Sequence, residues 1–359
     1  MTYFNQYIFE VFLLIMMVVI IYMKKVWTTR ENKGLSFNSA WNNRSYSLIP
    51  LRGISKNSNS TGLDPHWVTG LVDAEGSFIL FIKLNKDNSK NLVKQIQLSF
   101  EISVHIKDID LLYKLKSFFG EVGNISIPSS RQDARLKITG LNDIFNYIIP
   151  HFKQYPLRGM KKIDYDLWSE CAELLLSKEH LQEKGLNRIL SIKSVLNNGL
   201  SDKLKAVFPN PLGGHVITID RPILEVVNIP LNPNYVSGFT EGDGCFTVNI
   251  SSNTNQVIAL YIVELHKREV TLLCNIQKFF GDVGSINTAL SRNSARFTIS
   301  SKSDLVSKVL PHFDAYKLQG NKLKNYLIFK EIVLLMKSKA HLTPEGLNKI
   351  KVLKEGLNK

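Results

Sequence analysis

The sequence contains few cysteines and no closely spaced cysteine pair. Only three of its 359 residues are cysteine, and none belongs to a CxxC motif. A disulfide framework or a structural zinc site needs clustered cysteines, so the sequence supports neither. The thiols of Cys171, Cys245 and Cys274 are expected to be buried.

Acidic residues are also scarce relative to basic ones. Asp and Glu total 31 against 45 Lys and Arg, which gives a formal net charge of +14. This excess favours a polyanionic partner, either nucleic acid or an anionic membrane surface. The chain is nevertheless not a disordered polyelectrolyte, because a hydrophobic content of 44% over this length is enough for two domains with cores.

Long apolar runs are missing except at the N-terminus. Val11–Met23 is uninterrupted by polar residues other than Tyr, but it is shorter than the roughly 20 residues that a membrane span needs. Residues 1–27 are therefore expected to be an anchor, a targeting segment or a fragment of an upstream reading frame, with any membrane contact made through residues 7–23. Residues 28–62 are rich in Asn and Ser and are predicted to be a polar linker.

The rest of the chain contains an internal repeat. The segment Trp67–Phe78 (WVTGLVDAEGSF) is matched by Tyr235–Phe246 (YVSGFTEGDGCF). Further matches follow at a constant offset of 161 residues, among them a Pro-His-Phe segment and a His-Leu…Gly-Leu-Asn segment in each half. Two units of this length indicate a duplicated domain with pseudo-twofold symmetry. We predict repeats at residues 63–200 and 232–359, joined by a linker at 201–231.

Each repeat is predicted to fold in the order helix, two strands, helix, two strands, helix. Pro65 and Pro233 each follow a capping residue and mark the start of a helix. Residues 95–106 alternate between apolar and polar, which is typical of a strand with one buried and one wet face. The other elements expected in the first repeat are helices at 108–119, 141–149 and 161–177 and strands at 124–128 and 134–139. The fold class is therefore α+β, with two αββαββα repeats whose antiparallel sheets are covered on one side by helices.

Small residues line one face of each repeated motif. Gly70 and Ala74 are four residues apart, as are Gly238 and Gly242, so each pair lies on one helix face. Small residues at this spacing let two helix backbones approach closely. The two motif helices are therefore predicted to pack against each other at the interface between the repeats.

That packing would bring Glu75 and Asp243 together at the ends of the two helices. The negative ends of both helix dipoles and the mutual repulsion of the two carboxylates make this arrangement unfavourable. A divalent cation would remove the conflict, because carboxylates and free carbonyl oxygens are the ligands that Mg²⁺ prefers. The alternative is that each acid is solvated separately in the turn that follows its helix.

The motifs resemble those of LAGLIDADG homing endonucleases, in the single-chain, double-motif form of organelle introns. The resemblance extends over about residues 63–359. It implies a monomeric endodeoxyribonuclease, dependent on Mg²⁺ or Mn²⁺, that makes double-strand breaks in a long DNA site by phosphodiester hydrolysis, the reaction of intron homing. It also implies a mitochondrial location, on the matrix side, with the N-terminal segment as a candidate membrane tether.

The resemblance assigns roles to several residues. Glu75 and Asp243 would bind the metal and activate water, assisted by the backbone carbonyls of Ala74 and Gly242. Lys161 and Lys322 would stabilise the charge that develops on the phosphate, with Lys162 as a competitor for the first of these roles. The remaining repeated polar residues are expected to have structural roles: capping or solvating the helix ends for Asp73 and Glu241, and packing at helix ends for His180 and His341.

The polar face of each sheet is predicted to enter the major groove of DNA. The candidates of the first repeat are Gln95, Gln97, Ser99, Glu101, Ser103, Arg135, Lys137 and Thr139. Those of the second repeat are Thr247, Asn249, Ser251, Arg296, Thr298 and Ser300. The lysines around the first hairpin, Lys83, Lys86, Lys90 and Lys94, are expected to contact phosphates. The alternative is that these residues only solvate an exposed sheet.

Two apolar residues, Ile79 and Phe81, lie on the row that should face DNA. They are suited either to thymine methyl groups or to a different partner, RNA or protein. Two other functions therefore remain open. One is a splicing cofactor (maturase) that binds its group I intron RNA, with or without residual nuclease activity. The other is a membrane-anchored protein with a basic soluble domain, which would account for residues 11–23 but not for the repeat.

Overall fold

The computed structural model describes residues 62–85, 93–128, 132–208, 219–224 and 229–358. All of them belong to one compact unit, Arg52–Lys359. The predicted N-terminal segment, and all but the last residue of the polar linker that follows it, lie outside the described residues. Among the helices that are described, none is long and apolar enough to cross a membrane.

The two motif helices are α3 (Pro65–Glu75) and α10 (Pro233–Asp243), and each begins at the predicted proline. The side chains of Asp64 and Asn232 accept hydrogen bonds from amides of the first turn, as N-cap residues do. Each helix runs through the acid of its motif and ends at a glycine with extended backbone. The helix starts are therefore confirmed, and each acid occupies the last helical position.

Each repeat contains one four-stranded antiparallel sheet. The first sheet has the order β1-β2-β4-β3 and is formed by β1 (Gly76–Leu84), β2 (Val93–His105), β3 (Asn124–Ser126) and β4 (Asp133–Ile138). The second has the order β5-β6-β8-β7 and is formed by β5 (Gly244–Ile250), β6 (Val257–His266), β7 (Ser285–Ala289) and β8 (Ser294–Ile299). The identical strand order confirms the duplication.

The helices of the two repeats also correspond. The longer ones in the first repeat are α4 (Ile109–Phe118), α6 (Ile149–Gln154), α7 (Lys161–Leu176), α8 (Glu183–Val195) and α9 (Asp202–Val207). Those in the second are α11 (Val270–Phe279), α13 (Leu310–Ala315), α14 (Lys322–Lys337) and α15 (Pro344–Glu355). Short α-helices and π-helical segments precede α6 and α13: α5 (Leu141–Asp143), η2 (Ile144–Ile148), α12 (Lys302–Asp304) and η6 (Leu305–Val309).

The α+β class is confirmed, but the predicted element order is incomplete. Helices α8, α9 and α15 were not predicted from the sequence. Helix α9 lies within the segment predicted to be a linker, residues 201–231, and its Leu204 is buried in the core of the first repeat. Arg221 of the same segment forms an ion pair with Asp164 of α7 at 2.8 Å. The first repeat therefore extends beyond residue 200.

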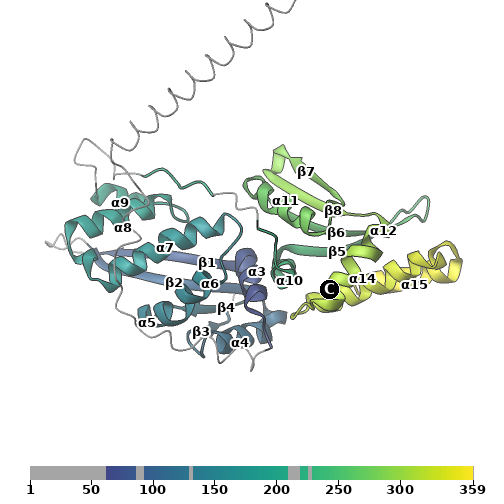
Figure 1. Cartoon of the computed structure of the whole chain (residues 1–359), viewed down its shortest axis with the longest axis horizontal. Helices are drawn as coiled ribbons and strands as arrows, with labels where there is room; N and C mark the ends of the chain where they lie inside the picture. The colour runs from purple at the N-terminus through teal and green to yellow at the C-terminus, as the bar shows by residue number, and fades with distance from the viewer. Residues whose placement is uncertain (1–61, 86–92, 129–131, 209–218, 225–228, 359) are drawn as a thin grey trace, which may run out of the picture. The chain divides into compact units, whose positions relative to one another are not determined.

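The core of each repeat lies between the apolar face of its sheet and the helices that contact it. Phe78, Phe100 and Trp168 are fully buried in the first core, and Phe246 and Phe329 in the second. Helices α4 and α7 contact the first sheet, and α11 and α14 contact the second. Helices α3 and α10 lie side by side between the two sheets (Figure 1).

Only one of the three cysteine thiols is buried in a core. Cys171 is buried, whereas Cys245 and Cys274 are partly exposed, so the expectation of three buried thiols is wrong for two of them.

Candidate active site and nucleic-acid interface

Glycines allow the close contact between α3 and α10. A Cβ atom on Gly70 would overlap the carbonyl oxygen of Tyr235, and one on Gly238 would overlap that of Trp67. A Cβ on Gly242 would overlap the side chain of Ala74. The predicted packing of the motif helices is confirmed, and at Gly70 and Gly238 backbone contacts backbone with no room for a side chain.

This contact brings Glu75 and Asp243 to one place. Glu75 Oε1 lies only 3.3 Å from the position that a Cβ atom on Gly242 would take. Burial raises the pKa of Glu75, and the charge of Asp243 raises it further, against the opposing effect of Lys161 and Lys322. Burial also raises the pKa of Asp243, opposed by the same two lysines. The acids are therefore not solvated separately in their turns.

The raised pKa values predict how stability depends on pH in the absence of divalent ions. The folded protein binds these two protons more tightly than the unfolded chain, so their contribution is fully present below the unfolded-state pKa and is lost as pH rises through the folded-state pKa. Urea unfolding in EDTA from about pH 5 to about pH 8 should show a smaller loss of unfolding free energy for the Glu75→Gln/Asp243→Asn double variant than for the wild type. Equal losses would contradict this assignment.

A lysine from each repeat reaches the end of the motif helix of the same repeat. Lys161 Nζ donates hydrogen bonds of 3.0 Å to the carbonyl oxygens of Val72 and Ala74. Lys322 Nζ donates to the carbonyls of Thr240, Gly242 and Gly244, at 2.9, 2.7 and 2.6 Å. The negative ends of the helix dipoles favour these ammonium groups.

The two lysines are also partly desolvated. Burial lowers the pKa of both Lys161 and Lys322, against the opposing effect of the neighbouring carboxylates. Lys162 is different, because it pairs with Asp166 one turn along α7 at 2.6 Å and its side chain is 38% exposed. Of the two lysines considered in the first repeat, Lys161 is therefore the one beside the motif.

Asp73 and Glu241 do not cap or solvate the helix ends, so that prediction is wrong. Asp73 is 7% exposed, and its Oδ2 accepts hydrogen bonds from the amides of Arg158 and Gly159, at 2.6 and 2.9 Å, and from the Tyr235 hydroxyl at 2.8 Å. Glu241 accepts from the amide of Gln319 at 2.7 Å. Each acid holds the loop that leads into the helix of the catalytic lysine candidate.

Three pairs of histidines repeat at the offset of 161 residues: His105 and His266, His151 and His312, and His180 and His341. The pair that contacts the motif helices, His151 and His312, has no role predicted from the sequence. His180 and His341 lie at the ends of the long helices, and His180 bonds the carbonyl of Leu174 there, in agreement with the prediction of helix-end packing. The buried histidines of the two Pro-His-Phe segments are instead hydrogen-bonded to the motif helices: His151 to Thr69 and His312 to Ser237, each at 3.1 Å.

These two histidines are uncharged at neutral pH. Burial lowers the pKa of His151 to about 3 and that of His312 to about 4. Their role is therefore to hold the motif helices in place. The repetition of the Pro-His-Phe segment at a constant offset was the one sequence feature that could have identified these histidines.

The first sheet's polar face is not uniformly wet. Ser99 and Glu101 are each 5% exposed, so the prediction of a wet face is wrong at these two residues. Glu101 forms ion pairs with Arg135 at 3.0 Å and Lys137 at 2.9 Å, both from the neighbouring strand β4. The long basic side chains cover the shorter residues of β2. Gln95, Gln97, Ser103 and Thr139 remain wholly or partly exposed.

The apolar residues of β1 occupy the same face. Phe81 is paired with Gln97 and is 51% exposed, and Ile79 is paired with Ser99 and is half-buried. Lys83 and Lys94 are exposed beside the hairpin, whereas Lys86 and Lys90 lie outside the described residues. Ile79 and Phe81 thus extend the polar surface with an apolar strip.

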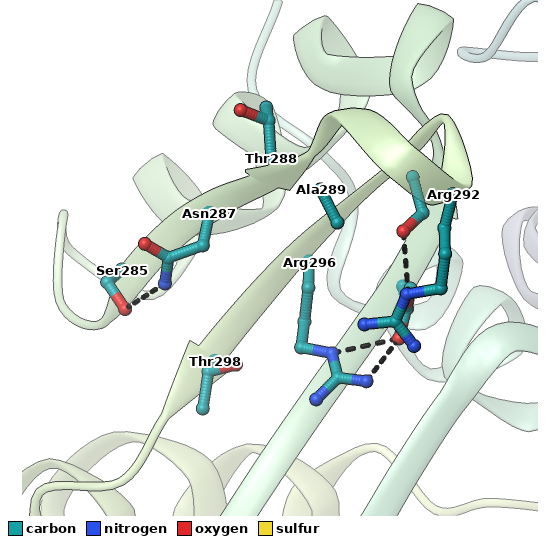
Figure 2. A pocket seen from close by; sticks show the side chains of 9 residues that line it. Ser285, Asn287, Thr288, Ala289, Arg292, Arg296 and Thr298 are labelled. Carbon is teal, nitrogen blue, oxygen red and sulfur yellow. Dashed lines mark hydrogen bonds and ion pairs between the residues drawn. The ribbon is translucent and has the colours of Figure 1, made fainter.

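The corresponding face of the second sheet has a hollow of about 350 Å³ (Figure 2). Arg296 from β8 lies in it and donates two hydrogen bonds to Glu264, at 2.8 and 2.5 Å, which hold the pKa of that carboxyl below its usual range. Thr298 lines the same hollow, while Thr247, Asn249, Ser251 and Ser300 are partly or fully exposed elsewhere on the repeat. Six polar residues of this hollow were not among the predicted candidates: Glu264, Ser285, Asn287, Thr288, Arg292 and Ser294.

A metal fits the site only with help from backbone oxygens. Within the described part of the chain, no group of three or more His, Cys, Asp or Glu side chains could hold a metal ion. The candidate ligands are instead two carboxylates, Glu75 and Asp243, and the carbonyl oxygens of Ala74 and Gly242, which accept hydrogen bonds from ammonium groups and so lie where positive charge is favoured. All are hard oxygen donors, the kind that Mg²⁺ prefers.

Comparisons with known proteins agree with this arrangement. A family described as LAGLIDADG endonuclease matches residues 68–172 and 236–333. A protein of Neurospora crassa named as a probable intron-encoded endonuclease is 33% identical over 88% of this chain and 70% of its own length. The crystal structure of the LAGLIDADG homing endonuclease I-GzeII with its DNA target covers 83% of this chain and 99% of its own, with a TM-score of 0.76 and 33% identity. That of I-SmaMI bound to cleaved DNA covers 82% and 97%, with a TM-score of 0.76 and 34% identity.

The family match includes most of each motif helix and both terminal acids, Glu75 and Asp243. The chain belongs to the LAGLIDADG endonuclease family.

Proposed function

We propose that this chain is an intron-encoded endonuclease that makes double-strand breaks in a long DNA site, the reaction of intron homing. The observation that carries the proposal is the convergence of Glu75 and Asp243, each with a partly buried lysine beside it, at the ends of two closely packed helices. One chain supplies both acids, so it acts as a monomer with one acid for each DNA strand. The names of the relatives support a protein that is encoded within an intron, and we propose a mitochondrial location.

The cleavage is metal-dependent phosphodiester hydrolysis. Glu75 and Asp243, with the carbonyl oxygens of Ala74 and Gly242, would hold Mg²⁺ or Mn²⁺. When bound, the metal supplies Lewis acidity and an activated water. The acids must be ionised for this, which their raised pKa values oppose and the nearby ammonium groups favour.

The two lysines would stabilise the negative charge that develops on the phosphate. Lys161 and Lys322 are held beside the acids by the helix carbonyls, in a partly desolvated environment where an ammonium group interacts strongly with a developing negative charge. They would stabilise the phosphate in the transition state. Because each is fixed before substrate binds, little reorganisation is needed at the moment of reaction.

Double-stranded DNA would lie across both sheets. The net charge of +14 favours contact with phosphates, and Arg135 and Arg296 occupy matching positions near the centre of each polar face. Each guanidinium is oriented by a carboxylate, Glu101 or Glu264. An arginine fixed in this way can bind the acceptor edge of guanine with two hydrogen bonds.

This assignment predicts different effects for two kinds of basic residue. Arg296→Ala should weaken binding by about 1–3 kcal/mol and relax the preference at one base pair. Lys83→Ala should weaken binding equally for all sequences and reduce the salt dependence by about one unit. Both are measured by binding to a duplex library with Ca²⁺ in place of Mg²⁺. A uniform loss in the arginine variant would show that it contacts phosphate only.

The function itself is tested with the full chain and a randomised duplex library in Mg²⁺, by sequencing of the double-strand ends. Cutting at one long sequence is the expected result. If folded protein cuts no duplex but binds its intron RNA, the function is that of a splicing cofactor, and Ile79 and Phe81 then become candidates for the RNA contact. Membrane fractionation with and without residues 1–60 tests whether the N-terminal segment is a tether.

A further inference from the structure

Helices α7 and α14 begin at Lys161 and Lys322, and the backbone amide that precedes each lysine donates hydrogen bonds to a carboxylate of the opposite repeat. The first amides of a helix have no partner within the helix and need one from outside. The amide of Met160, which precedes Lys161, donates to both carboxylate oxygens of Glu269, at 3.2 and 3.0 Å. The amide of Asn321, which precedes Lys322, donates to Asp108 Oδ1 at 2.6 Å.

The two acids occupy equivalent positions, 161 residues apart. Asp108 is the N-cap residue of α4 and Glu269 is that of α11, yet neither side chain forms a cap hydrogen bond to its own helix. Such a bond ordinarily stabilises the helix when Asp provides it. In both repeats that contribution is absent, and the carboxylate instead accepts a hydrogen bond from an amide of the other repeat.

Each loop is held from two sides. A Cβ atom on Gly159 would lie 3.1 Å from both Asp73 Oδ1 and Glu269 Oε2, so the glycine lies between an acid of its own repeat and an acid of the other. In the second repeat, Gly320 lies in the same way between Glu241 and Asp108. The acid within the repeat ties the loop to the motif helix, and the acid across the interface ties it to the neighbouring repeat.

We propose that Glu269 and Asp108 are positioning residues, which set the places of Lys161 and Lys322 respectively across the repeat interface. This inference rests on the proposed nuclease function of those lysines. The amide that each acid binds is one residue from the lysine, so a loop shift is passed directly to the ammonium group. Each lysine therefore reaches its working position only when the opposite repeat is docked, which couples cutting of each strand to assembly of the whole site.

A role for the two acids that is limited to holding the repeats together predicts a different effect on the cleavage of the two strands. If they only held the repeats together, loss of either would disturb the single interface and slow both strands alike. If they position the lysines, each loss should act on one strand. The strands can be told apart, because Lys161→Met and Lys322→Met should each slow a different one and so identify it.

The test is strand-resolved cleavage of an end-labelled target duplex by the full chain. Glu269→Ala should slow the strand assigned to Lys161 by roughly 10- to 100-fold, the scale expected of a small misplacement. Asp108→Ala should slow the other strand by a similar factor. DNA affinity with Ca²⁺ should change by no more than about two-fold, because neither acid is among the residues predicted to contact DNA. Glu269→Gln retains an acceptor oxygen and should recover most of the rate lost in the alanine variant.

Asp110→Ala serves as the matched control, because Asp110 is an exposed acid in the first turn of α4. It should leave both strands unchanged. Equal slowing of both strands by Glu269→Ala, slowing of the strand that belongs to Lys322, or no slowing would each overturn the proposal.

Hydrogen exchange separates this proposal from failure of the nuclease function. The amide of Met160 should exchange slowly in the wild type and much faster in Glu269→Ala, while the core amides of β2 stay protected. If the wild type cuts no duplex, the function fails and the contact is still tested by exchange. Unchanged exchange at Met160 would overturn the positioning role whatever the cleavage result.

Discussion

Replacement of Glu75 by Gln, or of Asp243 by Asn, is expected to abolish double-strand cleavage in Mg²⁺. The amides keep the size of the acids but cannot supply the charge that a divalent cation needs. Since groups that act as a unit in catalysis fail together, either single change should lower the cleavage rate by roughly 10³-fold or more. The measurement is single-turnover cleavage of the target duplex.

The same variants should remain folded and bind DNA. The two acids are partly buried, and their pKa values are raised by burial, so at neutral pH their replacement removes an unfavourable interaction and should increase the unfolding free energy in EDTA.

Lys162→Gln is the control for the cleavage measurement, because Lys162 is close in sequence to Lys161 but pairs with Asp166. Cleavage within about 10-fold of wild type by Glu75→Gln would contradict the assigned role.

Gly238→Ala is expected to cause a large loss of stability. A Cβ atom there would overlap the carbonyl of Trp67, a backbone group that cannot move aside by changing rotamer. Alanine would gain about 1 kcal/mol in helix propensity, but overpacking costs typically about 1–3 kcal/mol and occasionally more. Because the clash is with backbone, we expect the cost to prevail, with a net loss of about 2 kcal/mol or more and separation of α3 from α10.

The measurement is urea unfolding of the full chain. Gly356→Ala is a suitable control, because its nearest neighbour would be the flexible end of Ile328 at 3.3 Å. This control should change stability by less than about 1 kcal/mol. A Gly238→Ala protein as stable as the wild type would mean that the helices do not meet at this point.

Much of the fold could be predicted from the sequence because its signals are local. Proline after a capping residue indicates where α3 and α10 begin, and strict alternation indicates β2. Helix α15 was missed because its sequence is rich in lysine and Ile350 is its only buried residue. Helix α8 was missed because most of its buried residues form one consecutive run, 189–192, and not the spacing of a helix face. Helix α9 was missed because it is short and buries only Leu204.

From the residues alone, the candidate site was predicted only where its chemistry lies within the repeated motifs, whereas Lys161 and Lys322 were assigned through the family resemblance. Glu75 and Asp243 end the two motifs, so repetition and charge were enough to identify them. The partners of Asp73 are a loop 85 and 86 residues along the chain and a tyrosine of the other repeat. No local pattern indicates such contacts.

The polar face of β2 shows the same limit. Alternation identifies the side of the strand on which Glu101 lies, but not that Arg135 and Lys137 from β4 fold over it. Burial of a polar residue therefore depends on the length and charge of side chains across the sheet, which alternation within one strand does not contain.

The most direct test of the metal site is to locate Mn²⁺ ions by anomalous scattering in crystals of the full chain bound to its target DNA. Density beside Glu75 and Asp243 in the wild type, and its loss in the Glu75→Gln/Asp243→Asn double variant, is the predicted result. Ions bound elsewhere, or retained by the double variant, would contradict the claim that these two acids hold the catalytic metal.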